Sequence, residues 1–317
     1  MTLSTIEVFD KRLEATVKGA QLEHLCTGAI WSEGPVWMHE DNSVLWSDIP
    51  NNRMLRWSEA DGMTVWREQI EFTNGHTRDL NGDLLHCSHG HRAIMRTSIE
   101  AGCIRAETAA TPVVNDYQGK RLNSPNDIVV KRDGTIWFTD PPYGILNNRE
   151  GHRASGELGS NYVFCYDPSS KQLRIASDYL EEPNGLAFSP DESLLYVSDT
   201  SAALHSSGDG NHHIIVFDVQ NAIHSALVNP RVFATVDPGL ADGFRLDVSG
   251  WIYTSSADSV QVYHPDGTLL GKIHVPEEVG NLTFGGAVNS NVRNHLYIAA
   301  STSLYRIVLN TQGIQTP

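Results

Sequence analysis

The feature that most constrains the fold of this chain is a repeat of about 50 residues. In each repeat, a short apolar or aromatic run follows a Gly, Asn or Asp turn and usually ends in small polar residues. Six such runs are present: Asp41–Asp48, Asn81–Ser88, Asp133–Asp140, Asp191–Asp199, Ser249–Ser255 and Asn294–Ala300. Their spacing lies in the range of β-propeller blades.

A second short run follows most of these and completes the pattern of a β-hairpin. These second runs are Met54–Trp57, Tyr162–Tyr166, Ile214–Phe217, Val260–Tyr263 and Leu304–Val308. Long amphipathic helices are missing: the best candidate, Ser58–Gln69, contains Gly62, Thr64 and Val65 and is expected to form a turn and a strand. The sequence therefore predicts an all-β fold.

Six repeats predict a six-bladed β-propeller that forms one domain over residues 1–317. The N-terminal stretch near Ile6–Phe9 is expected to close the ring beside the last blade. Two stacked β-sandwiches are the alternative, but no Pro/Ser-rich or charged linker divides the chain. Residues Ile145–Asn161 are polar and glycine-rich, which predicts a long loop over one face.

Charge and composition argue against several classes of partner. Lys and Arg number 23 against 38 Asp and Glu, a net charge of -15, which disfavours nucleic acids and anionic membranes. No apolar run approaches the roughly 20 residues that span a bilayer. No signal peptide is visible, and the four widely spaced cysteines (Cys26, Cys87, Cys103 and Cys165) suggest reduced thiols. A cytoplasmic protein is expected.

Four polar motifs stand directly before apolar strands in different repeats. They are Trp31–Pro35, Asn123–Asp127, Glu182–Gly185 and Ala241–Gly243. The first strand of each propeller blade lines the central channel, so equivalent positions converge on one axis. Two carboxylates and two amide oxygens would meet there and form a hard-ligand site that favours Ca²⁺, with Mg²⁺ and Mn²⁺ as alternatives.

Ordinary turn chemistry is the competing interpretation of these motifs, because Asn-Gly, Asp-Gly and Pro-Asn are frequent in turns. For one motif alone the two interpretations are nearly equal. The set of four favours ligation, because the motifs lie at the opposite strand ends from hairpin turns such as Asp133-Gly134. The pairs His212-His213 and His89/His91 are weaker candidates for metal ligands.

The ordered motifs resemble those of the senescence-marker-protein/gluconolactonase/regucalcin-like family of sugar lactonases. The resemblance covers roughly residues 25–310 and is carried by Trp31–Trp37, Lys120–Val130, Thr139–Gly144, Pro183–Phe188 with Leu195–Asp199, and Asp242–Asp247. It implies a six-bladed propeller with a central divalent cation, Ca²⁺ before Mg²⁺, Mn²⁺ or Zn²⁺. The implied ligands are Glu33, Asn126, Asn184 and Asp242.

The resemblance implies a gluconolactone-like substrate that is hydrolysed to an aldonic acid. The cation would polarise the carbonyl and activate water, and Asp242 would act as the base, with simple ligation as its alternative role. Arg121, Asn123 and Tyr143 are expected to bind substrate hydroxyls, although Arg121 could instead form a structural ion pair. The family's substrate arginine corresponds here to Ser124, which leaves the sugar open.

Two alternatives to lactone hydrolysis stay open. Relatives of this scaffold include organophosphate and fluorophosphate hydrolases, and a non-catalytic metal-binding propeller would carry the same ligands. Ligands from four blades that converge on a channel open to solvent favour an enzyme. The sequence does not determine the oligomeric state.

Overall fold

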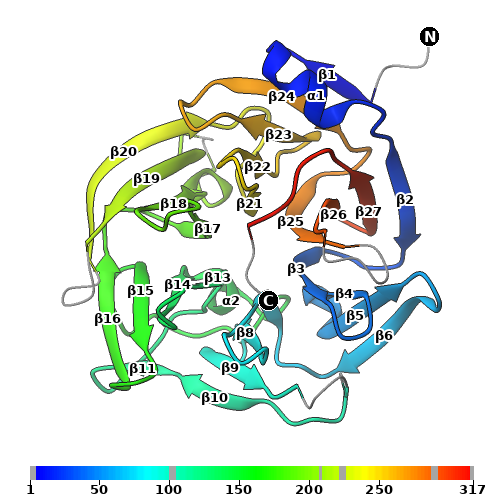
Figure 1. Cartoon of the computed structure of the whole chain (residues 1–317). Coiled ribbons are helices and arrows are strands. Elements are labelled where there is room, and N and C mark those ends of the chain that lie inside the picture. The colour runs from blue at the N-terminus through cyan, green and yellow to red at the C-terminus, as the bar shows by residue number, and fades with distance from the viewer. Residues whose placement is uncertain (1–4, 100–104, 207–208, 221–225, 287–291, 315–317) are drawn as a thin grey trace.

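The computed structural model describes residues 5–99, 105–206, 209–220, 226–286 and 292–314. Six antiparallel sheets surround a central axis like the blades of a propeller (Figure 1). The six-bladed, all-β prediction is confirmed. Cys103 lies outside the described residues, Cys26 and Cys87 are free thiols, and Cys165 is buried.

Each blade is built on four strands, which follow chain order from the axis outward in the first five blades. The outer strand of the last blade comes from the N-terminal part of the chain, and blade 5 has an additional fifth strand. Blades 1 to 3 are β3 (Ser32–Met38), β4 (Ser43–Asp48), β5 (Arg53–Ser58) and β6 (Gly62–Glu68); β7 (Thr73–Arg78), β8 (Leu84–Ser88), β9 (Ala93–Thr97) and β10 (Thr111–Val114); and β13 (Ile128–Val130), β14 (Ile136–Asp140), β15 (Tyr162–Asp167) and β16 (Gln172–Ser177). Blades 4 to 6 are β17 (Pro183–Phe188), β18 (Leu194–Asp199), β19 (His213–Val219) and β20 (Leu227–Thr235); β21 (Phe244–Leu246), β22 (Ile252–Thr254), β23 (Ser259–Tyr263) and β24 (Leu269–His274); and β25 (Val279–Gly285), β26 (His295–Ala300), β27 (Ser303–Val308) and β2 (Leu22–Thr27).

The remaining elements are short. A two-stranded hairpin, β11 (Asp116–Tyr117) and β12 (Lys120–Arg121), precedes blade 3. The helices in the described ranges are single turns: η1 (Lys11–Leu13), α1 (Glu14–Val17), η2 (Ile49–Asn51), α2 (Tyr143–Leu146) and η3 (Ser201–Ala203). None of these helices is long or apolar enough to cross a membrane.

The recurring apolar runs form the second strand of each blade, because these strands are covered on both faces by neighbouring blades. Aromatic side chains join the blades across these faces. Trp137 packs edge-on against Phe188 of the next blade with ring centroids 5.6 Å apart, and Trp37 stacks on Tyr297 at 5.5 Å across the junction of blades 1 and 6. Burial of such rings stabilises the stack of blades.

The N-terminal residues close the ring differently from the prediction. The stretch near Ile6–Phe9 was expected beside the last blade, but β1 (Ile6–Val8) pairs with β24 and adds a fifth strand to blade 5. The closing strand is β2, which pairs with β27. The intervening helical turns bury Leu13 and Val17 in the core shared by blades 5 and 6, and this anchor turns the chain before β2.

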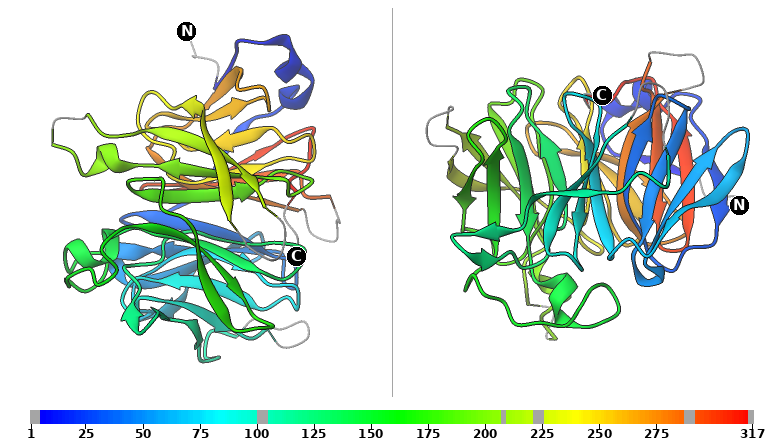
Figure 2. Two further views of the ribbon diagram at one scale, coloured as in Figure 1. Left: turned by 90° about the vertical axis from the view of Figure 1, so that its left-hand side faces the viewer. Right: turned by 90° about the horizontal axis from the view of Figure 1, so that it is seen from below.

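The two faces of the ring carry different segments. The loop after α2 projects from one face, whereas the C-terminal segment runs to the centre of the opposite face (Figure 2). There the Ile314 N–H donates to the Leu246 carbonyl at 3.2 Å, and Gly313 bridges to Asp247. The C-terminal segment thus lies over the inner strand of blade 5.

Candidate active site

A cavity of about 310 Å³ opens at the face that carries the α2 loop, where the inner strands begin. All four predicted ligand residues line it, together with the predicted substrate residue Tyr143. The complete wall consists of Trp31, Glu33, Ile49, Asn74, His89, Asn126, Tyr143, Arg149, Glu150, Asn184, Thr200, Ala203, Leu240 and Asp242. Residues far apart in the sequence therefore meet at the axis.

The inner strands approach one another so closely that glycine is required beside the ligand positions. They contact each other in a closed cycle, β3–β7–β13–β17–β21–β25 and back to β3. A Cβ on Gly243 would lie 2.0 Å from Cγ of Asn281, and one on Gly34, at φ +55°, would lie 2.1 Å from the Asn74 carbonyl. The Glu-Gly and Asp-Gly pairs thus serve close packing at the axis, and the turn interpretation does not account for them.

The aspartate that ends the second strand of blades 1, 3 and 4 fixes the segment before the predicted ligand. Its carboxylate accepts a backbone N–H from the residue three positions before that ligand. The Ile30 N–H donates to Asp48, the Asn123 N–H to Asp140 and the Glu181 N–H to Asp199, each at 2.8 Å. One hydrogen bond, repeated in three blades, sets the approach of Glu33, Asn126 and Asn184 to the axis.

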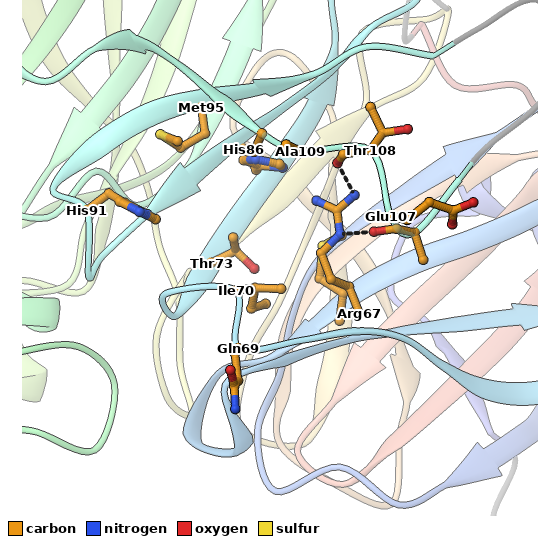
Figure 3. A pocket seen from close by; sticks show the side chains of 13 residues that line it. Arg67, Gln69, Ile70, Thr73, His86, His91, Met95, Glu107, Thr108 and Ala109 are labelled. Atoms are coloured by element: carbon orange, nitrogen blue, oxygen red, sulfur yellow. Dashed lines mark hydrogen bonds between the residues drawn. The ribbon is translucent and has the colours of Figure 1, made fainter.

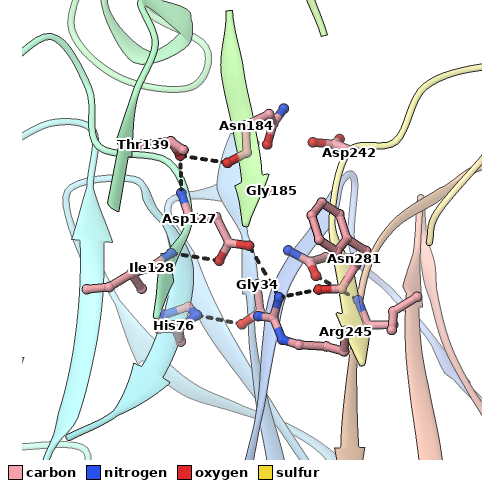
Figure 4. Close-up of polar contacts among 12 residues, drawn as sticks. Gly34, His76, Asp127, Ile128, Thr139, Asn184, Gly185, Asp242, Arg245 and Asn281 are labelled. Carbon is pink, nitrogen blue, oxygen red and sulfur yellow. Dashed lines mark hydrogen bonds and ion pairs between the residues drawn. The ribbon is translucent and has the colours of Figure 1, made fainter. Parts of the chain in front are cut away.

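The Ser or Thr that precedes each of these aspartates binds the next blade. Its hydroxyl donates to the backbone carbonyl of the residue at the ligand position: Ser47 to Asn74 (3.1 Å), Thr139 to Asn184 (2.7 Å) and Ser198 to Asp242 (3.3 Å). Figure 4 shows the central case, in which Thr139 also accepts the Asp127 N–H at 3.1 Å. Each Ser/Thr-Asp pair therefore orients the predicted ligand of its own blade and the residue at the equivalent position of the next blade.

The two carboxylates of the site lie in a poorly solvated region. Burial, followed by the charge of Asp242, raises the pKa of Glu33 well above its ordinary value. Burial likewise raises the pKa of Asp242 to about 7, although hydrogen bonds to Glu33 and Asn184 act in the opposite direction. Two neighbouring buried carboxylates of this kind are stabilised by a positive charge between them.

The donor set fits a divalent cation at this place. Glu33 Oε2 accepts the Gly34 N–H at 3.0 Å, whereas the buried Oε1 has no hydrogen-bond partner within the part of the chain that the structure describes. Asn184 Nδ2 donates to Thr200 at 3.1 Å, and the Asn184 and Asp242 side chains point toward each other (Figure 4). Carboxylate and amide oxygens whose lone pairs accept no hydrogen bond are suitable ligands for hard cations such as Ca²⁺.

Polar groups complete the wall around these ligands. The Tyr143 hydroxyl lies 2.6 Å from the Thr200 hydroxyl, and burial raises the pKa of Tyr143. His89 Nδ1 binds the Glu150 carbonyl at 2.8 Å, and burial lowers the pKa of His89 to about 4. His89 is therefore a neutral hydrogen-bonding group at neutral pH.

Two predicted substrate residues lie outside the wall of the cavity. Arg121 is exposed on β12, where its backbone N–H donates to Glu157 at 2.9 Å. Asn123 is buried, and its side-chain amide donates to the backbone carbonyls of Asp140 and Ser160 at 3.2 and 3.1 Å. Asn123 thus shapes the loop that carries Asn126, and neither Arg121 nor Asn123 lines the cavity, so their contact with a substrate stays a prediction.

The loop Ile145–Asn161 borders the cavity as its polar composition predicted. Arg149 and Glu150 belong to the wall, and His152 anchors the loop to Glu71 with Nε2 and Oε2 2.8 Å apart. Among the lining residues that the structure describes, Arg149 is the one Lys or Arg side chain.

Sequence reasoning missed Asn74 and named His89 only as a weaker candidate for a metal ligand, yet both residues line the cavity. Asn74 could have been found from the Asn74-Gly75 pair, because it occupies in blade 2 the place of Glu33-Gly34 in blade 1. His89 follows the second strand of blade 2, and its position depends on the α2 loop. No periodic signal marks it.

A second cavity of about 280 Å³ lies beside blade 2, lined by Met54, Arg67, Thr73, His86 and Met95 among others (Figure 3). It contains none of the residues predicted for the central site, although His91, a weaker candidate for a metal ligand, lines it. His212, one of the other candidate histidines, binds the Val236 carbonyl through Nδ1 at 2.9 Å. In the described ranges, no three His, Cys, Asp or Glu side chains gather in a group that could hold a metal.

Comparison with known proteins agrees with this architecture. A gluconolactonase from Zymomonas mobilis is 32% identical over 334 residues, covering 98% of this chain and 88% of the relative. The structure of a gluconolactonase from Xanthomonas campestris superposes with a TM-score of 0.85 at 38% identity, covering 97% of this chain and 96% of the other.

More distant structures share the fold. The calcium-binding protein regucalcin from Agrobacterium tumefaciens superposes with a TM-score of 0.70 at 17% identity, covering 93% and 95% of the two chains. Residues 31–302 match the family described as the SMP-30/gluconolactonase/LRE-like region. The match includes strands of all six blades, and the chain is a member of the SMP-30/gluconolactonase/LRE-like family.

Proposed function

We propose that this protein is a hydrolase that converts a gluconolactone-like sugar lactone to the aldonic acid at a divalent cation in the central cavity. The observation that carries the proposal is the convergence of Glu33, Asn126, Asn184 and Asp242, from four blades, on one cavity open to solvent. The gluconolactonases that are 32% and 38% identical over nearly the whole chain support the choice of substrate class.

The four converging residues would hold the cation, and the unpartnered Oε1 of Glu33 supports this role. When bound, a divalent cation polarises a carbonyl oxygen and lowers the pKa of water. Ca²⁺ is the favoured ion because all four donors are oxygen atoms, and Mg²⁺, Mn²⁺ and Zn²⁺ are the alternatives.

Asp242 is the proposed general base. It is less buried than Glu33, and its carboxylate faces the cavity where a water molecule would approach the lactone carbonyl. Its backbone is fixed from both sides, because the N–H donates to the Ser255 hydroxyl at 2.7 Å and the carbonyl accepts the Gly185 N–H at 2.9 Å. A base held in this way loses little freedom when it accepts a proton.

The polar wall would bind the sugar hydroxyls. The Tyr143 hydroxyl can donate or accept a hydrogen bond. Neutral His89 uses its Nδ1–H on the Glu150 carbonyl and can accept a hydrogen bond at Nε2, and Arg149 supplies a cation near the mouth of the cavity. A carboxylate forms when the lactone ring opens, and a guanidinium stabilises such a charge. Arg149 is therefore proposed to contact the product carboxylate.

The test is a hydrolysis assay on sugar lactones with protein stripped by EDTA and then reloaded with one cation at a time. We expect activity to disappear with EDTA and to return best with Ca²⁺. Glu33→Gln should weaken cation binding, measured by calorimetry, because it removes a charged oxygen ligand. Full activity in EDTA would refute cation dependence, and faster hydrolysis of a fluorophosphate than of any lactone would refute the substrate class.

A further inference from the structure

A buried ion pair crosses the channel directly beneath the proposed cation site. Arg245 Nη1 and Asp127 Oδ2 lie 3.3 Å apart, and both side chains are at least 96% buried (Figure 4). Asp127 follows the ligand Asn126 by one residue, and Arg245 follows Asp242 by three. The pair therefore joins blade 3 to blade 5, past the inner strand of blade 4.

Both partners of this pair are rigidly attached to the strands that carry the ligands. Arg245 Nη1 also donates to the Phe244 carbonyl at 2.8 Å, and Asp127 Oδ1 accepts the Ile128 N–H at 2.9 Å. The ion pair is thus a cross-link between the start of β13 and the start of β21. A change in its length would move Asn126 relative to Asp242.

The same pair separates two cavities. Neither Arg245 nor Asp127 lines the 310 Å³ cavity that contains the proposed ligands. Arg245 instead lines a smaller cavity of about 80 Å³ toward the opposite face, together with Ile128, Leu246 and Ile314. The guanidinium therefore lies at the boundary between the cation site and the far end of the channel.

Charge gives the pair a second role. Glu33, Asp127 and Asp242 would otherwise place three carboxylates around one narrow, poorly solvated channel. A buried carboxylate without a counter-charge is strongly destabilising. Arg245 neutralises Asp127, which leaves Glu33 and Asp242 as the carboxylates available to a bound cation.

We propose that Arg245 is a positioning residue of the cation site: paired with Asp127, it fixes the distance between the Asn126 and Asp242 strands and closes the channel beneath them. The inference rests on the proposed cation site. Groups that orient metal ligands typically change metal affinity by about 10–100-fold when removed. A purely structural ion pair would change only the stability of the fold.

The experiment measures Ca²⁺ affinity by calorimetry on chelator-stripped protein, together with the Tm of the Ca²⁺-free form. Arg245→Met keeps the length of the side chain without its charge and should weaken Ca²⁺ binding by at least 10-fold. Arg245→Lys should restore part of the affinity. If Arg245→Met does not fold, Asp127→Asn takes its place in the experiment. This variant retains the shape of the side chain and should also weaken Ca²⁺ binding.

The matched control is Arg78→Met, since Arg78 forms an ion pair with Glu40 and is 3% exposed but lies away from the cavity. It should lower the Tm and leave Ca²⁺ affinity within twofold. If Arg245→Met and Asp127→Asn behave like this control, the positioning role is refuted. Wild-type protein that binds no divalent cation also overturns it, whereas cation-loaded protein that hydrolyses no lactone refutes only the proposed substrate.

Discussion

Asp140 offers a direct test of how the loops that carry the proposed ligands are held in place. Its Oδ2 accepts the Asn123 N–H at 2.8 Å, while its Oδ1 is buried without a partner among the described residues. Burial raises the pKa of Asp140 from 3.8 to about 7. For an acid whose pKa is raised by folding, stability falls as the pH rises from the unfolded to the folded pKa.

Asp140→Asn keeps an oxygen acceptor for Asn123 and removes this pH dependence. A shift from 3.8 to about 7 is worth roughly 4 kcal/mol at pH 8 and less than half of that at pH 5. The free energy of unfolding of the variant minus that of wild type should therefore increase by roughly 2.5 kcal/mol between pH 5 and pH 8. A constant penalty for the new buried N–H would cancel in this comparison.

The measurement is denaturant unfolding in EDTA, followed by tryptophan fluorescence at pH 5, 6.5 and 8. Asp133→Asn is the control, because hydrogen bonds from Thr135 and Lys131 lower the pKa of Asp133. Its stabilising effect is complete above pH 5, so that variant should be destabilised equally at all three pH values. If the difference in unfolding free energy between Asp140→Asn and wild type stays constant or decreases as the pH rises, the pKa of Asp140 is not raised by burial.

Three further predictions concern the cavity. Asp242→Asn should lower kcat by about 10²–10⁴ at saturating Ca²⁺ if Asp242 is the base; recovery of kcat at saturating Ca²⁺ would leave it only a ligand. Arg149→Gln should raise KM or the inhibition constant of the aldonate product. Its Tm should not change, because Arg149 is exposed. Unchanged steady-state kinetics would show that Arg149 does not contact the substrate or the product. Gly243→Ala should cost about 1–3 kcal/mol or more and weaken Ca²⁺ binding, since its Cβ would lie 2.0 Å from Cγ of Asn281; calorimetry indistinguishable from wild type would contradict the close packing at the axis.

The sequence predicted the blades and the four converging residues because both follow the period of the repeat. It also displayed the Ser-Asp and Thr-Asp endings of the second strands, but their role depends on contacts with the first strand and the next blade. The roles of Asp48 and Thr139 are therefore visible only in the assembled propeller, where Asp48 binds the segment before Glu33 and Thr139 binds the next blade. Arg121 and Asn123 are predicted to bind substrate because they lie in a stretch that matches the family's motifs, yet that loop folds so that the Asn123 amide donates to the backbone of its own blade.

The closing strand β2 links the two ends of the chain across nearly its whole length, with Leu22 paired to Ile307. During synthesis, residues 22–27 must wait without their partner until residues 303–308 have been made. Pairing at such separation is slow, because the entropy of closing the intervening loop is lost before the contact forms. In a chain that lacks β27, β26 and β2 each have an unpaired edge, and unpaired strand edges promote association between chains. A nascent or truncated chain that lacks β27 is therefore expected to aggregate, whereas a circularly permuted chain that joins β27 to β2 by a short turn should fold faster.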